Sequence, residues 1–282
     1  MIELWGLRTL AVASVTLMVG GLSISSEALG QSDSTTQMSI SRGQEPLTRQ
    51  QLSQLMSVWA MRAERGDTRA MVDLGMAYST GQYTPADPVK AVGLLRRAAE
   101  AGNALGQFFL AQRYVDGNGV DQNLSEALRL YGLAAGQGYA PAQVELAKFY
   151  YLGTGVEQDL VRSANLNRTA AESGSAEAAF NLGIQYSTGK GVPHDMEEAI
   201  RLFRQAAEKG LVKAQIRLAK AYLQDPNVPR DPAEAARWLR LATDKGDRTA
   251  TAMLATLYAE GDGVPQDTTE AARLRATLPT PP

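Results

Sequence analysis

Six tyrosines recur at a fixed interval of 36 residues, and this period constrains the fold more than any other feature of the chain. A leucine precedes each tyrosine by four residues and a glycine precedes it by twelve, as Leu74 and Gly66 precede Tyr78. A constant period of this length predicts an array of stacked structural repeats, in which each unit contacts only its neighbours. The tyrosines are Tyr78, Tyr114, Tyr150, Tyr186, Tyr222 and Tyr258.

Each unit is predicted to form two helices joined by a glycine turn. Residues such as Ala142, Leu146 and Tyr150 are four positions apart, which places them on one stripe of the first helix. A G-x-G-V turn follows in four units, and its first glycine suits the positive φ at a helix end. Six second helices begin at an aspartate or asparagine, a preferred N-cap, and in four of them a glutamate three residues later resembles a capping box. The N-cap residues are Asp87, Asn123, Asp159, Asp195, Asp231 and Asp267.

The repeated pattern resembles the Sel1-like repeat family, a relative of the tetratricopeptide repeats. The similar features are the A-x-x-x-L-G-x-x-Y stretch at residues 70–78, the G-x-G-V turn, the following aspartate and the A-A-x-x-G ending, over roughly residues 67–276. The resemblance implies an all-α fold, a right-handed α-solenoid of antiparallel helix pairs with six 36-residue repeats. It also implies that partners bind on the concave face. Residues 49–65 are predicted to form an unpaired helix that caps the start of the solenoid.

One unit departs from the others in its second helix. Asn167 stands where other units have Leu95, Tyr131, Phe203 or Leu239, and Ser163 stands where others have alanine. A polar side chain at a stacking position costs about 1–3 kcal/mol of stability. In an array with nearest-neighbour contacts only, one weak contact divides the stack. We therefore predict a softer joint around Asn167.

The N-terminus has the three-part pattern of an export signal. Arg8 precedes a mostly apolar run at residues 10–24, and small residues including Ala28 and Gly30 precede a polar stretch. We expect residues 1–30 to be a signal peptide, 31–48 a flexible polar leader, 49–277 the solenoid and 278–282 a proline-rich tail. The expected location is therefore periplasmic or secreted. An uncleaved membrane anchor is the alternative, although a spanning helix needs about 20 apolar residues.

Composition excludes several classes of function. The net charge is −2, and no block of like charge favours nucleic acid or an anionic membrane as a partner. The chain has no cysteine and one histidine, His194, so a zinc site of cysteine and histidine ligands cannot be built. We expect no metal, no cofactor, no nucleic acid and a monomeric chain. Contact with a membrane is expected only if the signal is uncleaved.

Fragments of catalytic motifs occur without their companions. Residues 183–190 have one residue too many for a phosphate loop, and Gly191 occupies its Ser/Thr place. Ser187 and Lys190 match S-x-x-K without the S-D-N or K-T-G that penicillin-recognising enzymes add. Asp195, beside His194, is already expected to be an N-cap. We predict that the chain is not an enzyme. A cell-wall or β-lactam hydrolase is the alternative, with Ser187 as its candidate nucleophile.

A groove on the first helices is the predicted binding site. Positions two residues either side of each repeat leucine, and the position after each tyrosine, lie away from the Ala–Leu–Tyr stripe. A groove here suits an extended or helical peptide, with aromatic anchors supplying most of the energy. Packing against the adjacent unit is the alternative role of the two phenylalanines. The predicted groove residues are Phe108, Gln112, Lys148, Tyr151, Phe180 and Lys220.

The predicted function is therefore that of an exported scaffold for non-covalent protein or peptide binding. The resemblance implies roles in envelope assembly, in regulation of membrane signalling proteins or in host interaction. Besides the hydrolase, a membrane-tethered structural adaptor remains an alternative if the N-terminal segment is retained.

Overall fold

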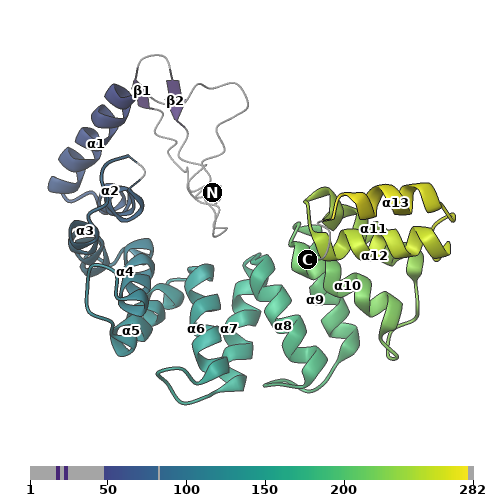
Figure 1. Ribbon diagram of the computed structural model, residues 1–282. Coiled ribbons are helices and arrows are strands. Elements are labelled where there is room, and N and C mark those ends of the chain that lie inside the picture. Colours follow the sequence, from purple (N-terminus) through teal and green to yellow (C-terminus); the bar gives the residue numbers. More distant parts are fainter. Residues whose placement is uncertain (1–16, 20–21, 25–47, 82, 279–282) are drawn as a thin grey trace, which may run out of the picture.

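The computed structural model describes residues 17–19, 22–24, 48–81 and 83–278, which form thirteen helices and two short strands (Figure 1). β1 (Leu17–Val19) and β2 (Leu22–Ile24) pair antiparallel, with Leu17 opposite Ile24. The helices are α1 (Arg49–Glu64), α2 (Thr68–Thr80), α3 (Pro88–Glu100), α4 (Ala104–Asp116), α5 (Leu124–Gly136), α6 (Ala140–Leu152), α7 (Leu160–Glu172), α8 (Ala176–Thr188), α9 (Met196–Glu208), α10 (Val212–Gln224), α11 (Pro232–Asp244), α12 (Arg248–Glu260) and α13 (Thr268–Ala276).

The helices pack in chain order, which confirms the predicted solenoid of six helix pairs. We call α2, α4, α6, α8, α10 and α12 the A helices, and α3, α5, α7, α9, α11 and α13 the B helices. Repeat one is α2–α3, and repeat six is α12–α13. α1 packs on α2 and caps the stack. Apart from β1 and β2, the predicted signal peptide lies outside the described residues, as do nearly all of the leader and tail.

The B helices begin where the sequence predicts. In all six, the Asp or Asn side chain accepts a hydrogen bond from a backbone N–H in the first turn, as Asn123 does from Glu126 at 3.0 Å. The capping box is wrong in its second half, because the Glu126 carboxylate binds Arg129 through two bonds of 2.6 and 2.8 Å. A two-point bond to a guanidinium is stronger than a bond to a neutral N–H, so the glutamate turns toward the arginine.

The second glycine of each G-x-G-V turn has a packing role that the sequence pattern did not show. Gly117 ends α4 with φ 68°, as predicted for a helix end. Gly119 lies against the start of α3 in the preceding repeat, where an added Cβ would stand 2.3 Å from the Pro88 carbonyl oxygen. Gly191 meets Leu160 in the same way. Only glycine allows the turn to approach the preceding repeat this closely.

The core runs along the solenoid between the helices. All six repeat leucines are buried, and burying each contributes about 1.5–3 kcal/mol. The buried apolar residues form two clusters. One runs from Ala63 to Phe149, and the other begins with Val144 and Ala164 and continues to Leu274. The division falls in repeat three, near Asn167.

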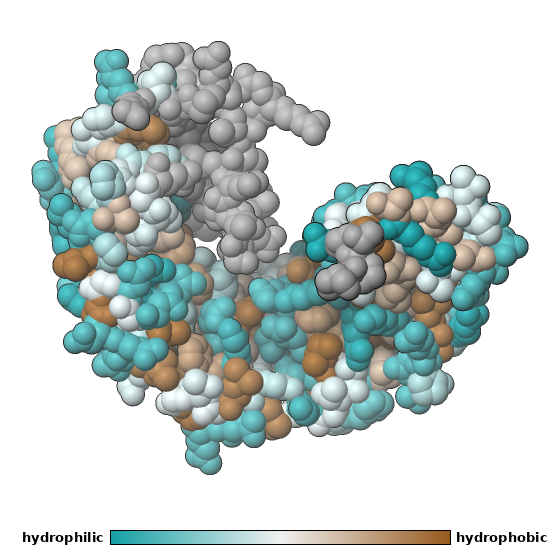
Figure 2. Space-filling view, viewed as in Figure 1, coloured by the Kyte–Doolittle hydropathy of each residue, from teal (hydrophilic) through white to brown (hydrophobic). Residues whose placement is uncertain are grey.

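The stacked repeats form an arc, with α1 at one end and α13 at the other (Figure 1). α2 and α4 lie nearer the inside of this arc than α3 and α5, and α2 contacts α4 directly. Figure 2 shows the inside of the arc as a hollowed surface where hydrophilic and hydrophobic residues are mixed. We call the surface formed by successive A helices, together with the joint between each A helix and the B helix before it, the inner groove.

Candidate functional site

Side chains from neighbouring A helices meet across the inner groove. Between α8 and α10, Lys213 pairs with Glu177 at 3.0 Å, and its ammonium lies 5.0 Å from the centre of the Phe180 ring. Glu177 and Lys213 occupy the same position in consecutive repeats, so a partner lying along the groove would cross equivalent positions in turn.

The two predicted aromatic anchors pack largely between repeats. Phe108 is only 8% exposed, and its ring lies 5.2 Å from that of Tyr139 and 5.7 Å from that of Tyr131. Phe180 is half-buried, 5.7 Å from Phe203. Both have the packing role given above as the alternative. Little of the Phe108 ring is open to a partner, whereas Phe180 is only half-buried.

The polar residues of the predicted groove are more accessible. Lys148 and Lys220 are exposed, at equivalent positions of α6 and α10, while Gln112 is half-buried on α4. Lys148 lies 3.8 Å from Glu145. Tyr151 is half-buried at the end of α6, and Lys190 lies 5.5 Å from the centre of its ring.

A shallow hollow of about 190 Å³ lies between α9 and α10 in this groove. The Arg217 guanidinium stands 5.7 Å from the centre of the buried Phe203 ring on the floor of the hollow. Lys220 and Gln224 continue the same side of α10. The hollow is lined by Met196, Phe203, Arg217, Lys220, Ala221, Gln224, Asp225 and Pro226.

Arg217 was not among the residues that the sequence singled out. It directly precedes Leu218, about 100° round the helix from that buried leucine, at the border between core and surface. The signal that could have found it is a change of side chain at one repeat position. That position carries Asp73 in repeat one, Glu145 in repeat three and Arg217 in repeat five.

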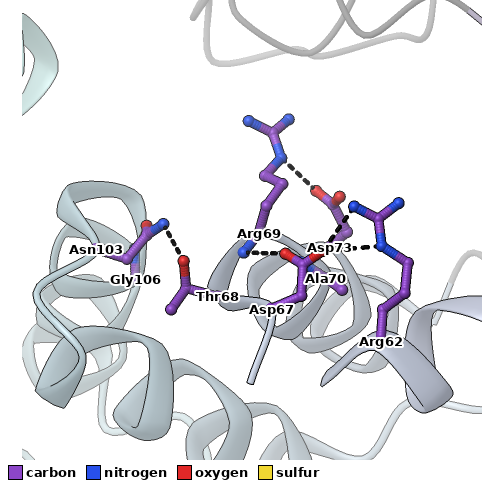
Figure 3. Close-up of polar contacts among 8 residues, drawn as sticks. All are labelled: Arg62, Asp67, Thr68, Arg69, Ala70, Asp73, Asn103 and Gly106. Carbon is purple, nitrogen blue, oxygen red and sulfur yellow. Dashed lines mark hydrogen bonds and ion pairs between the residues drawn. The ribbon is translucent and has the colours of Figure 1, made fainter. Parts of the chain in front are cut away.

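The acidic members of this series lie in the first half of the groove. In repeat one Asp73 accepts a hydrogen bond from Arg69 at 3.0 Å (Figure 3). Burial raises the pKa of the Asp73 carboxyl and that of the Glu145 carboxyl. Figure 3 also shows Asp67 capping α2 while it pairs with Arg62, and Asn103 donating to Thr68. These contacts tie repeat one to α1 and to repeat two.

A larger hollow of about 390 Å³ lies outside the inner groove, between α2 and α3. It is lined by Leu74, Tyr78, Lys90, Gly93, Leu94 and Arg97. Gly93 stands where four other repeats have an arginine, so the missing side chain explains the hollow. We therefore place the candidate site in the inner groove, where charged and aromatic groups converge.

A buried polar cluster occupies the joint between repeats three and four, which we call the seam. Asn167 of α7 donates to the side-chain oxygen of Gln185 of α8 at 2.9 Å. Gln185 donates to Ser163 and to the Leu160 carbonyl, each at 3.4 Å. The side-chain oxygen of Asn167 is buried without a hydrogen-bond partner. Asn167 is therefore buried at this joint with one amide hydrogen bonded to Gln185, and the softness of the joint stays a prediction.

The fragments of catalytic motifs make ordinary structural contacts. The Ser187 hydroxyl donates to the Ile184 carbonyl of its own helix at 3.0 Å, while Lys190 lies over Tyr151. His194 is exposed in the loop before Asp195, which caps α9 as predicted. Within the described residues, no three acidic or histidine side chains gather as metal ligands. Of the helices described, none is long and apolar enough to cross a membrane.

Comparison with known proteins gives a family and two close folds. The Sel1 repeat model matches residues 68–103, 104–139, 140–175, 176–211, 212–247 and 249–274. The structure is similar to that of c5321, described as a protective antigen present in uropathogenic Escherichia coli strains displaying an SLR fold. The identity is 34% and the TM-score 0.73, over 82% of this chain and 48% of that one, so the chain spans about half the length of the antigen.

A second similar structure is a Sel1 repeat protein from Oxalobacter formigenes. It is 27% identical with a TM-score of 0.70, over 81% of this chain and 98% of that one. No curated protein matches the chain.

Proposed function

The chain belongs to the Sel1 repeat family, and we propose that it is an exported scaffold that binds a protein or peptide partner in its inner groove. Sel1 repeat proteins are generally protein-interaction scaffolds, and their fold is not catalytic. The finer parts of the proposal are export, the use of the inner groove, and a role in envelope assembly, signalling regulation or host interaction.

One observation carries the choice of the inner groove. Glu177 and Lys213 pair between α8 and α10, and α10 places Arg217, Lys220 and Gln224 around a hollow floored by Phe203. Stacking of the repeats uses the Ala–Leu–Tyr stripe and leaves these positions free. A concave surface that combines an apolar floor with a few polar groups is typical of binding sites.

The interaction is tested by cross-linking and capture from an envelope extract of the source cell. The groove variant Lys148→Glu, Ile184→Glu, Lys220→Glu changes one equivalent position on three consecutive A helices. We expect the native chain to capture a specific protein and the groove variant to lose it, because three added carboxylates change both the charge and the apolar character of the groove.

The matched control is Val161→Glu, Lys209→Glu, Arg248→Glu. It also replaces one apolar and two basic residues, and all three are exposed and lie outside the hollow. This control should capture the same protein as the native chain. Equal capture by the groove variant, with its helical circular dichroism intact, would place binding on another surface.

Export is tested separately by the mass of the chain recovered from cells. We expect the recovered chain to begin near Gln31, in the periplasm or the medium, because residues 1–30 have the pattern of a cleaved signal. Recovery of the full mass in the membrane fraction would instead support the membrane-tethered adaptor.

A further inference from the structure

The inner groove changes its charge along the solenoid. In its first half, the carboxylate of Asp73 is paired with Arg69, and that of Glu145 lies 3.8 Å from Lys148. Each of these charges has an opposite charge beside it. In repeat five, the equivalent residue is Arg217, and among the residues that the structure describes neither Arg217 nor Lys220 forms an ion pair. At Arg217 and Lys220 the groove therefore carries positive charge that no ion pair neutralises.

The surroundings hold Arg217 in place. Its guanidinium lies over the Phe203 ring, and a cation over an aromatic face is attracted to it. Phe203 is 1% exposed, so this platform is rigid. Lys220 lies one turn further along α10 at the edge of the same hollow. A guanidinium that stacks on a ring keeps its N–H groups available, and these match the two oxygens of a carboxylate.

The nearby acidic groups leave this charge in surplus. Asp225 lines the end of the hollow, but its carboxylate accepts hydrogen bonds from the Asn227 backbone and side chain at 3.0 and 3.4 Å. Glu177 is paired with Lys213 at the far side of the groove. The hollow therefore has two cations, Arg217 and Lys220, and one carboxylate, Asp225, which is already hydrogen-bonded to Asn227.

We propose that the α8–α10 part of the inner groove binds an acidic, extended segment of the partner protein. An Asp or Glu carboxylate of that segment lies between Arg217 and Lys220. A neighbouring aliphatic side chain packs beside the two cations, on the half-buried Met196 and the exposed Pro226 that line the hollow. This inference rests on the proposed function, because it names the chemistry of the partner at the same groove.

The test is selection from a random library of displayed 12-residue peptides by the purified chain. We expect the native chain to enrich peptides rich in Asp and Glu at least severalfold over the library. The charge-reversal variant Arg217→Glu, Lys220→Glu should lose these peptides and enrich Lys and Arg instead. The control Lys209→Glu, Arg248→Glu carries the same change of net charge outside the hollow and should select as the native chain does.

A selected peptide then gives a quantitative measurement by fluorescence anisotropy. Replacing its Asp and Glu by Asn and Gln should weaken binding on the order of tenfold or more, since the paired carboxylate is removed. Binding of the acidic peptide should also weaken as salt rises. The variant Arg217→Gln, Lys220→Gln removes the charge without reversing it and serves if the charge-reversal variant does not fold.

Each outcome decides for or against the inference. Selected peptides with no acidic excess, or peptides that bind the charge-reversal variant equally well, overturn the acidic partner while the scaffold function stands. Failure to select any peptide also overturns it. The capture experiment with the Lys148, Ile184 and Lys220 variant then decides independently whether the groove binds a protein at all.

Discussion

Repeats three and four have helices of identical length, yet their packing differs. At one equivalent buried position of the B helices, repeat four has Phe203 and repeat three has Asn167. This residue contacts the residue 18 positions later, which belongs to the following repeat. The pair is Tyr131 with Phe149 across the joint between repeats two and three, and Asn167 with Gln185 across the seam. The backbone is thus set by caps and glycines, while the strength of each joint is set by one pair of side chains.

The same two repeats differ in how they hold their tyrosines. Tyr186 of repeat four accepts a hydrogen bond from Arg168 of repeat three at 3.3 Å. The hydroxyls of Tyr114, Tyr222 and Tyr258 each accept a hydrogen bond from the arginine 18 positions earlier. For Tyr150 of repeat three that position is Gly132, and Arg162 covers the tyrosine ring at 4.4 Å instead. We therefore expect repeat three to be joined more weakly to both of its neighbours.

The largest effect on stability is expected from removing the buried aromatic ring of repeat four. Phe203→Ala should lower the free energy of unfolding by about 3–5 kcal/mol, because a buried aromatic side chain leaves a cavity. Asn167→Ala in repeat three should cost clearly less, since Asn167 is smaller and one of its polar atoms is unsatisfied. Urea unfolding followed by circular dichroism measures both. Equal losses would contradict the difference between the two joints.

The next effect is expected from making the seam resemble the last joint of the solenoid. Asn167→Leu with Gln185→Leu reproduces the pair Leu239 and Leu257, and should raise the free energy of unfolding by about 1–3 kcal/mol. Asn167→Leu alone should gain less, because the side-chain oxygen of Gln185 then loses its donor.

A double-mutant cycle between these two positions measures the coupling directly. In the native chain, amide hydrogens of α7 and α8 should exchange faster than those of α11, because opening at a weak joint exposes the helices beside it. If the double variant unfolds at the same urea concentration as the native chain, the seam is not a weak joint.

A smaller gain is expected from restoring the missing arginine beside Tyr150. Gly132→Arg should add about 1 kcal/mol, since glycine is a poor helix residue and the new guanidinium can reach the tyrosine hydroxyl. An added Cβ at Gly132 meets nothing within 4 Å, so the site has room. Gly132→Ala is the control for helix propensity. A gain no larger than that of the alanine variant would show that the hydrogen bond adds nothing.

The smallest effect concerns Glu145 of repeat three, whose counterpart in repeat four is Asn181. Burial raises the pKa of the Glu145 carboxyl above its ordinary value of 4.5, and Lys148 opposes this shift. The folded chain therefore keeps the Glu145 carboxyl protonated at pH values where the unfolded chain has already lost this proton. As pH rises through that window, the group lowers the free energy of unfolding. Glu145→Gln should be slightly more stable than the native chain at pH 7 and equal to it below pH 4. Thermal melts at both pH values test the sign.

The sequence was a reliable guide where local chemistry decides the structure. Helix starts at residues such as Asn123 and helix ends at residues such as Gly117 follow from capping and from positive φ, which act within one turn. The site was less predictable. Phe108 occupies a groove position in a single helix, but Tyr139 of the next repeat covers it. Arg217 lies over Phe203 of the preceding repeat, and this contact between repeats cannot be read from one repeat alone.

The close contact between Gly119 and Pro88 has a consequence for how this chain changes in evolution. Because each G-x-G-V turn rests on the helix start of the preceding unit, adding or deleting one residue there would displace the turn from that helix. The two units with different turns, around Thr84 and around Asn227, still keep the 36-residue spacing. We therefore expect length to change by duplication or loss of whole units, and a longer relative to extend the arc with complete copies.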